Sequence, residues 1–198
     1  MNLIEAKKAL RSEVRAAERA LPPRYRAESN AGINARLLAL PEFRMAQTVF
    51  AFVGTSREID TTEFLTETLR QGKRLCVPLC TGPGIMELRR ITGFDDLTPG
   101  AYGILEPKAD CPAVPLDEID FAVIPCVSCD REGHRLGQGG GFYDRFLAAY
   151  RGPAYLICRE RLLRSEIPME PHDAIIHWVV TEKTLYEDGI PDQMSRHL

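Results

Sequence analysis

Short apolar runs rich in β-branched and aromatic residues recur along the chain and are separated by segments with helical spacing. The first two runs are Gln47–Val53 and Lys73–Leu79, with a helical segment from Thr61 to Gly72 between them. Runs this short and this apolar are typical of strands buried on both faces of a parallel sheet. The order strand, helix, strand predicts a βαβ unit and places the chain in the α/β class.

Further segments extend this pattern in both directions. We expect two N-terminal helices, the first ended by Pro22 and the second running from Arg24 to Leu40, and a later helix from Gly141 to Tyr150. Four more runs are predicted strands: Ile85–Ile91, Asp120–Cys126, Ala154–Cys158 and Ile175–Thr181. The chain carries no internal repeat and no linker. We therefore predict one domain over residues 1–198, a three-layer α/β/α unit with a mainly parallel, Rossmann-like sheet.

Composition narrows the classes of function. Hydrophobic residues make up 44% of the chain and charged residues 27%, as in a globular protein with a substantial core. The net charge of -3 argues against a nucleic-acid binder, which usually has a basic excess. No apolar stretch approaches the roughly 20 residues of a membrane helix, and the N-terminus has no signal-peptide core. We expect a cytoplasmic monomer without a partner protein.

Six cysteines are present, most of them inside apolar runs. Cys126 and Cys129 have the spacing of a metal-binding or redox pair, but the sequence shows neither two further zinc ligands at matching spacing nor the helix start that a redox pair requires. Reduced structural thiols are the favoured interpretation, and a metal or redox role is the alternative.

The strongest local signal is the segment Arg135–Arg145, RLGQGGGFYDR, which follows a buried strand and a polar loop and opens a helix. Glycines let the backbone approach a phosphate, and a helix N-terminus favours negative charge. The segment lacks the ending of a P-loop and the spacing of the Rossmann fingerprint, so a glycine-rich packing turn remains an alternative. Arg135 and Asp144 favour phosphate and magnesium binding.

PCVSCDREGHRLGQGGGFYD, from Pro125 to Asp144, resembles the hallmark of the 5-formyltetrahydrofolate cyclo-ligase family, P-x-x-x-x-D-x-x-G-x-R-L-G-x-G-x-G-x-Y-D. Other segments match the family in order and spacing, so the resemblance spans nearly the whole chain: Lys7–Arg11, Arg57–Thr61, Tyr102–Pro107 and Ile167–Asp173. The glycine motif is specific; the others are weak singly and strong together.

The resemblance implies ATP and Mg²⁺ as co-substrate and cofactor, and it implies roles for matching residues. ATP would be bound by Lys7, Lys8, Ala9, Leu10, Arg11, Arg135, Leu136, Gly137, Gln138, Gly139, Gly140, Gly141, Phe142 and Tyr143. The folate would be bound by Arg11, Val53, Glu58, Gln138, Gly139, Gly140, Gly141 and Phe142. Magnesium would be held by Asp144 and Asp173, and the catalytic set would be Arg135, Gly139, Gly141, Tyr143 and Asp144.

From the residues alone, several of these positions favour other interpretations. The basic stripe of the first helix is more typical of a solvated face. Glu58 resembles a loop carboxylate near a helix cap, and Asp173 resembles a turn residue after Pro171. The chain also departs from the family pattern: Cys126 and Cys129 stand where a glycine and a phenylalanine are usual, and Gln138 replaces an aromatic or basic residue.

The function implied by the resemblance is ATP-dependent conversion of 5-formyltetrahydrofolate to 5,10-methenyltetrahydrofolate, with release of ADP and phosphate. The formyl oxygen would be phosphorylated and N10 would then close the ring. Two alternatives remain: a non-catalytic relative that binds folate or nucleotide, and another small-molecule kinase or ligase that uses ATP.

Overall fold

The fold is known from a computed structural model, which describes residues 2–100, 103–171 and 173–192. Tyr102 and His172, at the edges of two family-like segments, lie outside the described residues, as do residues 1, 101 and 193–198 of the predicted domain. The described helices include none that is long and apolar enough to cross a membrane.

The elements alternate much as the sequence predicts. In chain order they are α1 (Leu3–Arg19), α2 (Pro23–Ala39), α3 (Pro41–Met45), β1 (Thr48–Phe50), α4 (Thr62–Arg70), β2 (Arg74–Gly82), β3 (Ile85–Ile91), η1 (Phe94–Asp96), β4 (Leu97–Pro99), β5 (Leu105–Pro107), η3 (Leu116–Glu118), β6 (Phe121–Ile124), β7 (Ser128–Cys129), β8 (Arg135–Leu136), α5 (Phe142–Ala149), β9 (Ala154–Ile157), η4 (Glu160–Leu162), β10 (Trp178–Val180), β11 (Leu185–Glu187) and β12 (Ile190–Pro191).

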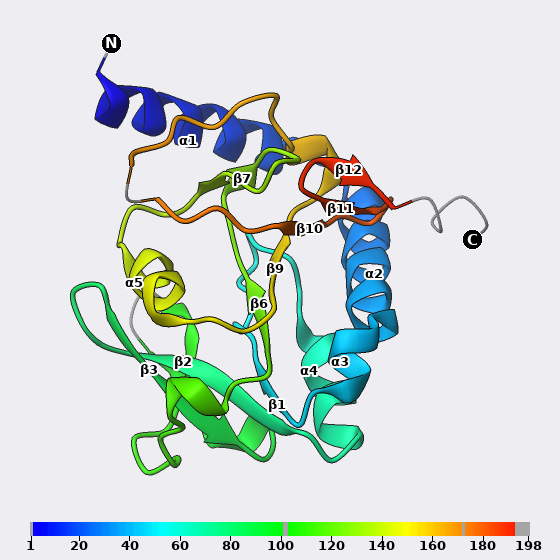
Figure 1. The fold of residues 1–198 in the computed structure, drawn as a ribbon, viewed down its shortest axis with the longest axis vertical. Coiled ribbons are helices and arrows are strands. Elements are labelled where there is room, and N and C mark those ends of the chain that lie inside the picture. The colour runs from blue at the N-terminus through cyan, green and yellow to red at the C-terminus, as the bar shows by residue number, and fades with distance from the viewer. Residues whose placement is uncertain (1, 101–102, 172, 193–198) are drawn as a thin grey trace.

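One eight-stranded sheet forms the centre of the molecule, in the order β12-β11-β10-β9-β6-β1-β2-β3 (Figure 1). The strands from β10 to β2 in this order pair in parallel. At one edge β3 is antiparallel to β2, and at the other β11 and β12 continue antiparallel from β10. The mainly parallel α/β sheet predicted from the apolar runs is therefore confirmed.

Two hydrophobic clusters, one on each face of the sheet, account for the layers. Alternate residues of each strand point to opposite faces. In β1, Val49 packs with α2, α3 and α4, whereas Phe50 packs with residues of α1 and α5 such as Val14 and Phe146. Figure 1 shows α2, α3 and α4 on one side of the sheet and α5 on the other, with α1 across the end where β6 and β9 finish.

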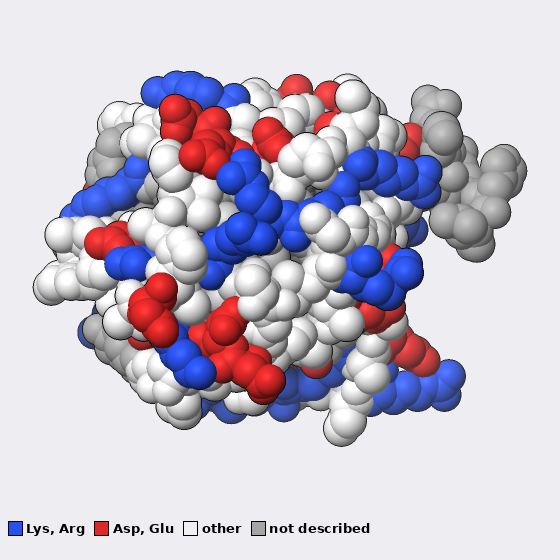
Figure 2. All heavy atoms as spheres, turned by 90° about the horizontal axis from the view of Figure 1, so that it is seen from below, with Lys and Arg blue, Asp and Glu red and all other residues white. Residues whose placement is uncertain are grey.

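Seen from the side away from α1, the surface carries both signs of charge (Figure 2). Acidic side chains flank the basic ones on this face. The end that α1 covers is the carboxyl end of the parallel strands, where open α/β sheets place their ligands. The predicted site residues lie at that end.

Candidate functional site

The glycine segment connects β8 to α5 at the edge of this end. Gly139 and Gly141 have φ values of +97° and +71°, a region of conformational space that favours glycine. Gly141 is the N-cap of α5, and no side chain caps the first N–H groups of that helix. The strand, glycine loop and helix predicted from the sequence are thus present, with backbone donors available at the loop.

Arg135 and Asp144 join the two ends of this segment. The guanidinium of Arg135, on β8, forms an ion pair with the carboxylate of Asp144 in the first turn of α5. Only 6% of the Arg135 side chain is exposed, against 36% for Asp144. The guanidinium also lies 5.8 Å from the ring centroid of Tyr143. The buried guanidinium of Arg135 and the partly exposed carboxylate of Asp144 therefore lie together beside the glycine segment.

The basic stripe of α1 packs against the glycine segment rather than facing solvent alone. Arg11 Nε donates a 2.7 Å hydrogen bond to the carbonyl oxygen of Gly137. One turn later, Arg15 donates a 2.7 Å hydrogen bond to Gln138 Oε1. The two contacts connect positions more than 120 residues apart in sequence. The interpretation of this stripe as a solvated face is therefore wrong for Arg11, whereas Arg15 stays exposed while it contacts Gln138.

Lys7 extends the same face of α1 toward the segment before β10. Its Nζ lies 2.5 Å from Asp173 Oδ2 and 2.9 Å from Glu170 Oε2. Asp173 Oδ2 also accepts a 2.7 Å hydrogen bond from the backbone N–H of Glu170. Lys8 and Ala9 are exposed, and Leu10 packs against the core. Lys7 and Lys8 therefore occupy different environments, a distinction that their adjacent positions in the sequence conceal.

Electrostatics tie α1, the glycine segment and Asp173 into one site. Burial lowers the pKa of Arg11, as do the nearby charges of Arg15 and Arg135, while Asp144 and Asp173 oppose the shift. For Lys7, burial alone would lower the pKa, but the hydrogen bonds to Asp173 and Glu170 outweigh it and raise the pKa. The excess of positive charge around Arg11 favours an anionic ligand.

A narrow cleft of about 90 Å³ lies beside the glycine segment, between α1 and the ends of β6 and β9. Arg15, Glu58 and Gln138 line it, together with Phe52, Cys126 and Arg159 among others. Glu58 Oε2 accepts a 3.1 Å hydrogen bond from the N–H of Thr55, which fixes the carboxylate within its loop. The cleft thus brings together two of the residues predicted to bind substrate, Glu58 and Gln138.

Three residues that were predicted to contact a ligand directly are placed differently in the structure. Val53 is buried in the core cluster beyond the end of β1, and its neighbour Phe52, from the same cluster, lines the cleft instead. Leu136 is 1% exposed, so only its backbone remains for a ligand. Phe142 borders an apolar groove between β3 and α5, away from the cleft.

Tyr143 packs inward from the first turn of α5. Burial raises the pKa of its phenol, and the nearby charge of Glu58 raises it further. Its ring lies 6.3 Å from that of Phe50 on β1. The phenol therefore stays protonated and can donate a hydrogen bond, but it is a poor source of a proton at neutral pH.

Three residues that complete the site's contacts were not singled out from the sequence. Arg15 repeats the spacing of Lys7 and Arg11, so the four-residue period was the available signal. Glu170 lies within the family-like segment Ile167–Asp173, three residues before Asp173. Arg145 donates a 2.9 Å hydrogen bond from Nη1 to the carbonyl oxygen of Gly84, fastening α5 to the turn between β2 and β3; nothing in the sequence indicates that contact.

Comparisons with known proteins agree with this geometry. The model of the 5-formyltetrahydrofolate cyclo-ligase family matches residues 3–182. A 5-formyltetrahydrofolate cyclo-ligase of Escherichia coli K12 is 31% identical over 180 residues, covering 88% of this chain and 99% of that protein. A mitochondrial 5-formyltetrahydrofolate cyclo-ligase of Arabidopsis thaliana is 29% identical, covering 91% of this chain and 75% of that protein.

A solved structure shares the fold over nearly the full chain. The 5,10-methenyltetrahydrofolate synthetase of Aquifex aeolicus superposes with a TM-score of 0.82 at 30% identity, covering 91% of this chain and 92% of that chain. The residues that the family model matches include both sides of the site, the basic face of α1 and the segment that contains Asp173. On this evidence of sequence and fold, the chain belongs to the 5-formyltetrahydrofolate cyclo-ligase family.

Proposed function

We propose that this protein converts 5-formyltetrahydrofolate to 5,10-methenyltetrahydrofolate at the expense of ATP, releasing ADP and phosphate. Family membership supports the overall reaction. The observation that carries the site assignment is the 2.7 Å hydrogen bond from Arg11 to Gly137, because it holds the basic face of α1 against the glycine segment. A phosphate-binding wall and a cleft for a second substrate then lie side by side.

ATP occupies the wall formed by α1 and the glycine segment. The backbone N–H groups of Gly139–Gly141 at the uncapped start of α5 bind phosphate oxygens. Arg11 and Lys8 neutralise phosphate charge from α1, and Arg135 does so from β8. Lys7 is held in place by its ion pairs with Asp173 and Glu170, and it contributes positive charge to this wall without direct contact with ATP.

Asp144 and Asp173 fit a magnesium ion that accompanies ATP. Magnesium prefers oxygen ligands and is usually held by one or two carboxylates together with substrate phosphates and water. Both aspartates lie at the ATP wall, each beside a basic side chain, and both charges reach Arg11. These two residues would hold the ion, which when bound would supply neutralisation of charge on the transferred phosphoryl group.

The folate lies in the cleft, with its formyl end toward the glycine segment. Glu58 and Gln138 supply a carboxylate and an amide for hydrogen bonds to the folate ring system, and Phe52 supplies an apolar surface. Gln138 lies between the two ligands, since its Oε1 accepts from Arg15 while its backbone continues into Gly139. Substitution of an aromatic or basic residue by glutamine at this position replaces stacking or charge by hydrogen bonding.

The main contribution of the protein to this reaction is to position the two substrates. A formamide oxygen is a poor leaving group, so it attacks the γ-phosphorus, ADP departs, and an imidate phosphate forms. N10 of the folate then attacks the activated carbon and loses its proton to solvent, and phosphate leaves as the ring closes. Such phosphoryl transfer is served by aligned donors and charge neutralisation rather than by a protein nucleophile. The loop N–H groups of Gly139 and Gly141, together with Arg135, stabilise the developing charge. Tyr143 supports that loop from beneath with a neutral phenol.

The decisive test mixes purified protein with ATP, magnesium and 5-formyltetrahydrofolate and follows the absorbance of the methenyl product. We expect product only when all three are present, with one phosphate released for each ring closed. No product at any enzyme concentration would reject the enzyme in favour of a binding-only relative. A stable phosphorylated product without free phosphate would instead identify a small-molecule kinase.

We extend the proposal to a cytoplasmic monomer that acts on small molecules alone. All six cysteines are free thiols in the structure, as expected for a reducing compartment. Light scattering on the purified protein, with and without ATP, tests the oligomeric state; a dimer would contradict this part of the proposal.

A further inference from the structure

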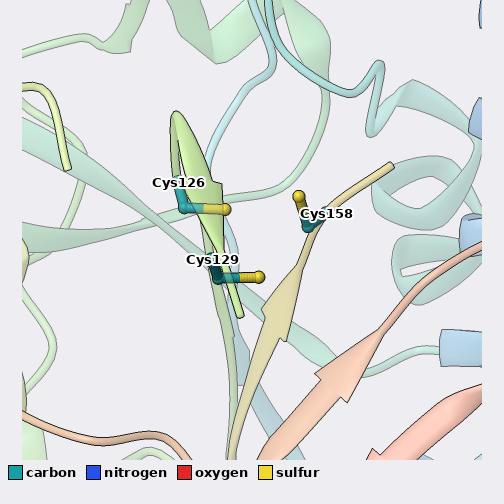
Figure 3. A group of neighbouring side chains, drawn as sticks. All are labelled: Cys126, Cys129 and Cys158. Carbon is teal, nitrogen blue, oxygen red and sulfur yellow. The ribbon is translucent and has the colours of Figure 1, made fainter. Parts of the chain in front are cut away.

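Three cysteine side chains from different segments meet behind the cleft. Cys126 follows β6, Cys129 is on β7 and Cys158 follows β9, and their sulfur atoms all lie within 4.8 Å of one another. Figure 3 shows the Sγ atoms of Cys126 and Cys129 directed toward the segment that carries Cys158. Cys129 and Cys158 are buried, and Cys126 is half-buried and lines the cleft.

Strand register accounts for this meeting. β6 and β9 pair in parallel with Ile124 opposite Leu156, so the residues two positions further on, Cys126 and Cys158, come side by side. Cys129, three residues after Cys126 in the short strand β7 that pairs with β8, places its sulfur beside the other two. Cys126 Sγ lies 3.4 Å from the carbonyl oxygen of Ile157, which holds it against the end of β9. The trio is therefore fixed by backbone pairing rather than by flexible loops.

The spacing of the sulfur atoms is close to what a metal ion requires. Zinc binds thiolate sulfur at about 2.3 Å, so two sulfurs on one tetrahedral ion lie roughly 3.8 Å apart. The observed limit of 4.8 Å is within about 1 Å of that separation. Small rotations of the three side chains would be enough to close the difference. Of the described residues, no other group of three or more histidines, cysteines or carboxylates has its ligand atoms this close together.

A buried positive charge accompanies the trio in the chain. Arg159 directly follows Cys158, is 3% exposed, and lines the same cleft as Cys126. Zinc binds thiolate sulfur, so an ion bound by the trio would displace the thiol protons, and Arg159 would balance the excess negative charge.

We propose that Cys126, Cys129 and Cys158 form a three-thiolate site for a thiophilic d¹⁰ cation, with Zn²⁺ as the ion tested first. Each thiol that binds releases one proton to solvent, and three thiolates with Zn²⁺ carry a net charge of one negative. Soft sulfur ligands select such ions over magnesium. With three protein ligands, a fourth position stays open to water or to a group in the cleft that Cys126 lines. This site is separate from the carboxylates assigned to magnesium.

The first experiment titrates the reduced, full-length protein with Co²⁺ under anaerobic conditions. We expect one equivalent to bind with a sulfur-to-metal charge-transfer band, which Zn²⁺ then removes. Cys158→Ser and Cys129→Ala should abolish the band and weaken Zn²⁺ binding more than about 100-fold, beyond the loss that follows removal of an outer-shell partner. Cys76→Ser and Cys111→Ser, which change cysteines outside the trio, serve as matched controls and should keep it.

A second measurement on the unmutated protein guards against variants that fail to fold. X-ray absorption at the zinc edge should show three sulfur neighbours at about 2.3 Å. A reduced, folded protein that binds no ion would overturn the proposal, as would zinc surrounded only by nitrogen and oxygen, or a charge-transfer band that survives loss of Cys158. None of these outcomes depends on cyclo-ligase activity, so this test and the assay of the proposed function can fail independently.

Discussion

Arg11 Nε lies 2.7 Å from the carbonyl oxygen of Gly137 and donates a hydrogen bond to it, so the first helix is fastened directly to the glycine segment. Arg11→Ala removes this bond and one positive charge from the ATP wall. A hydrogen bond to a charged group contributes about 1.5–3 kcal/mol, so kcat/KM for ATP should fall by about 10- to 100-fold. Steady-state kinetics of the variant would measure this fall in kcat/KM.

Two further substitutions make this result specific. Arg11→Lys keeps the charge but not the planar fork, and it should give an intermediate loss. Arg24→Ala, which changes an exposed arginine paired with Glu28 on α2, should leave the kinetics unchanged. Unaltered kinetics in Arg11→Ala would refute the placement of ATP against α1.

Substitutions of Lys7 and of Lys8 should affect different properties, the first the stability of the protein and the second its affinity for ATP. Lys7→Ala removes the ammonium group that forms ion pairs with Asp173 and Glu170 in a mostly buried position, so the free energy of unfolding should fall by about 1–2 kcal/mol. Lys8→Ala should mainly raise KM for ATP, because its side chain is exposed, with no change in the urea midpoint. A reversed pattern, with stability lost in Lys8→Ala, would contradict both assignments.

The contribution of Lys7 to stability should also depend on pH. Its contacts raise the folded-state pKa above the ordinary value of 10.5. The stabilisation is therefore fully present below pH 10.5 and is lost as the pH rises through the folded-state pKa. The difference in free energy of unfolding between the native protein and Lys7→Met should stay constant from neutral pH to about pH 9 and shrink above pH 10.5. Denaturation at a series of pH values measures it; a difference that grows above pH 10.5 would show the opposite sign of shift.

Asp144→Asn tests the carboxylate at the start of α5. The amide preserves the shape and can still accept a hydrogen bond from Arg135, so folding should change little. Loss of a metal-binding charge should lower kcat by about 100- to 1,000-fold and change the dependence on magnesium. Asp95→Asn, which removes a carboxylate from the first turn of η1, is the control. If turnover and magnesium dependence both survived in Asp144→Asn, the metal role of Asp144 would be wrong.

The glycine segment offers a test of backbone conformation. Alanine at position 139 would have to adopt φ of +97°, so Gly139→Ala should destabilise the protein by about 1–2 kcal/mol. Gly93→Ala is the matched control, because Gly93 has an extended backbone with open space where a Cβ would lie, and it should change stability little. Urea denaturation of the two variants decides the matter; equal midpoints would mean that the loop relaxes freely.

Local patterns in the sequence predicted the layers but not the small pairings. Buried strands such as β6 and helices such as α2 follow from continuous apolar runs and from prolines at helix ends. The two-stranded pairings β4–β5 and β7–β8 involve two or three residues per strand, too few for a periodicity to be recognised. Their pairing is set by the surrounding fold rather than by local propensity.

For the site, too, local features could be predicted from the sequence and long-range contacts could not. The strand-glycine-helix order and the nearby charges indicated an anion site, and the family resemblance added the N-terminal helix. Contacts between distant segments stayed hidden: the ion pair of Lys7 with Asp173 spans 166 positions. The cysteine trio was invisible for the same reason, because Cys158 joins Cys126 and Cys129 only through the register of β6 with β9.

The contact between α1 and the glycine segment has a consequence for synthesis of the protein. One side of the site comes from α1 and the other from residues 137–173, so more than 120 residues must be synthesised between them. Long-range contacts of this kind form only after the intervening chain is available. A nascent chain therefore cannot have both the Arg11–Gly137 contact and the Lys7–Asp173 contact until synthesis has passed Asp173.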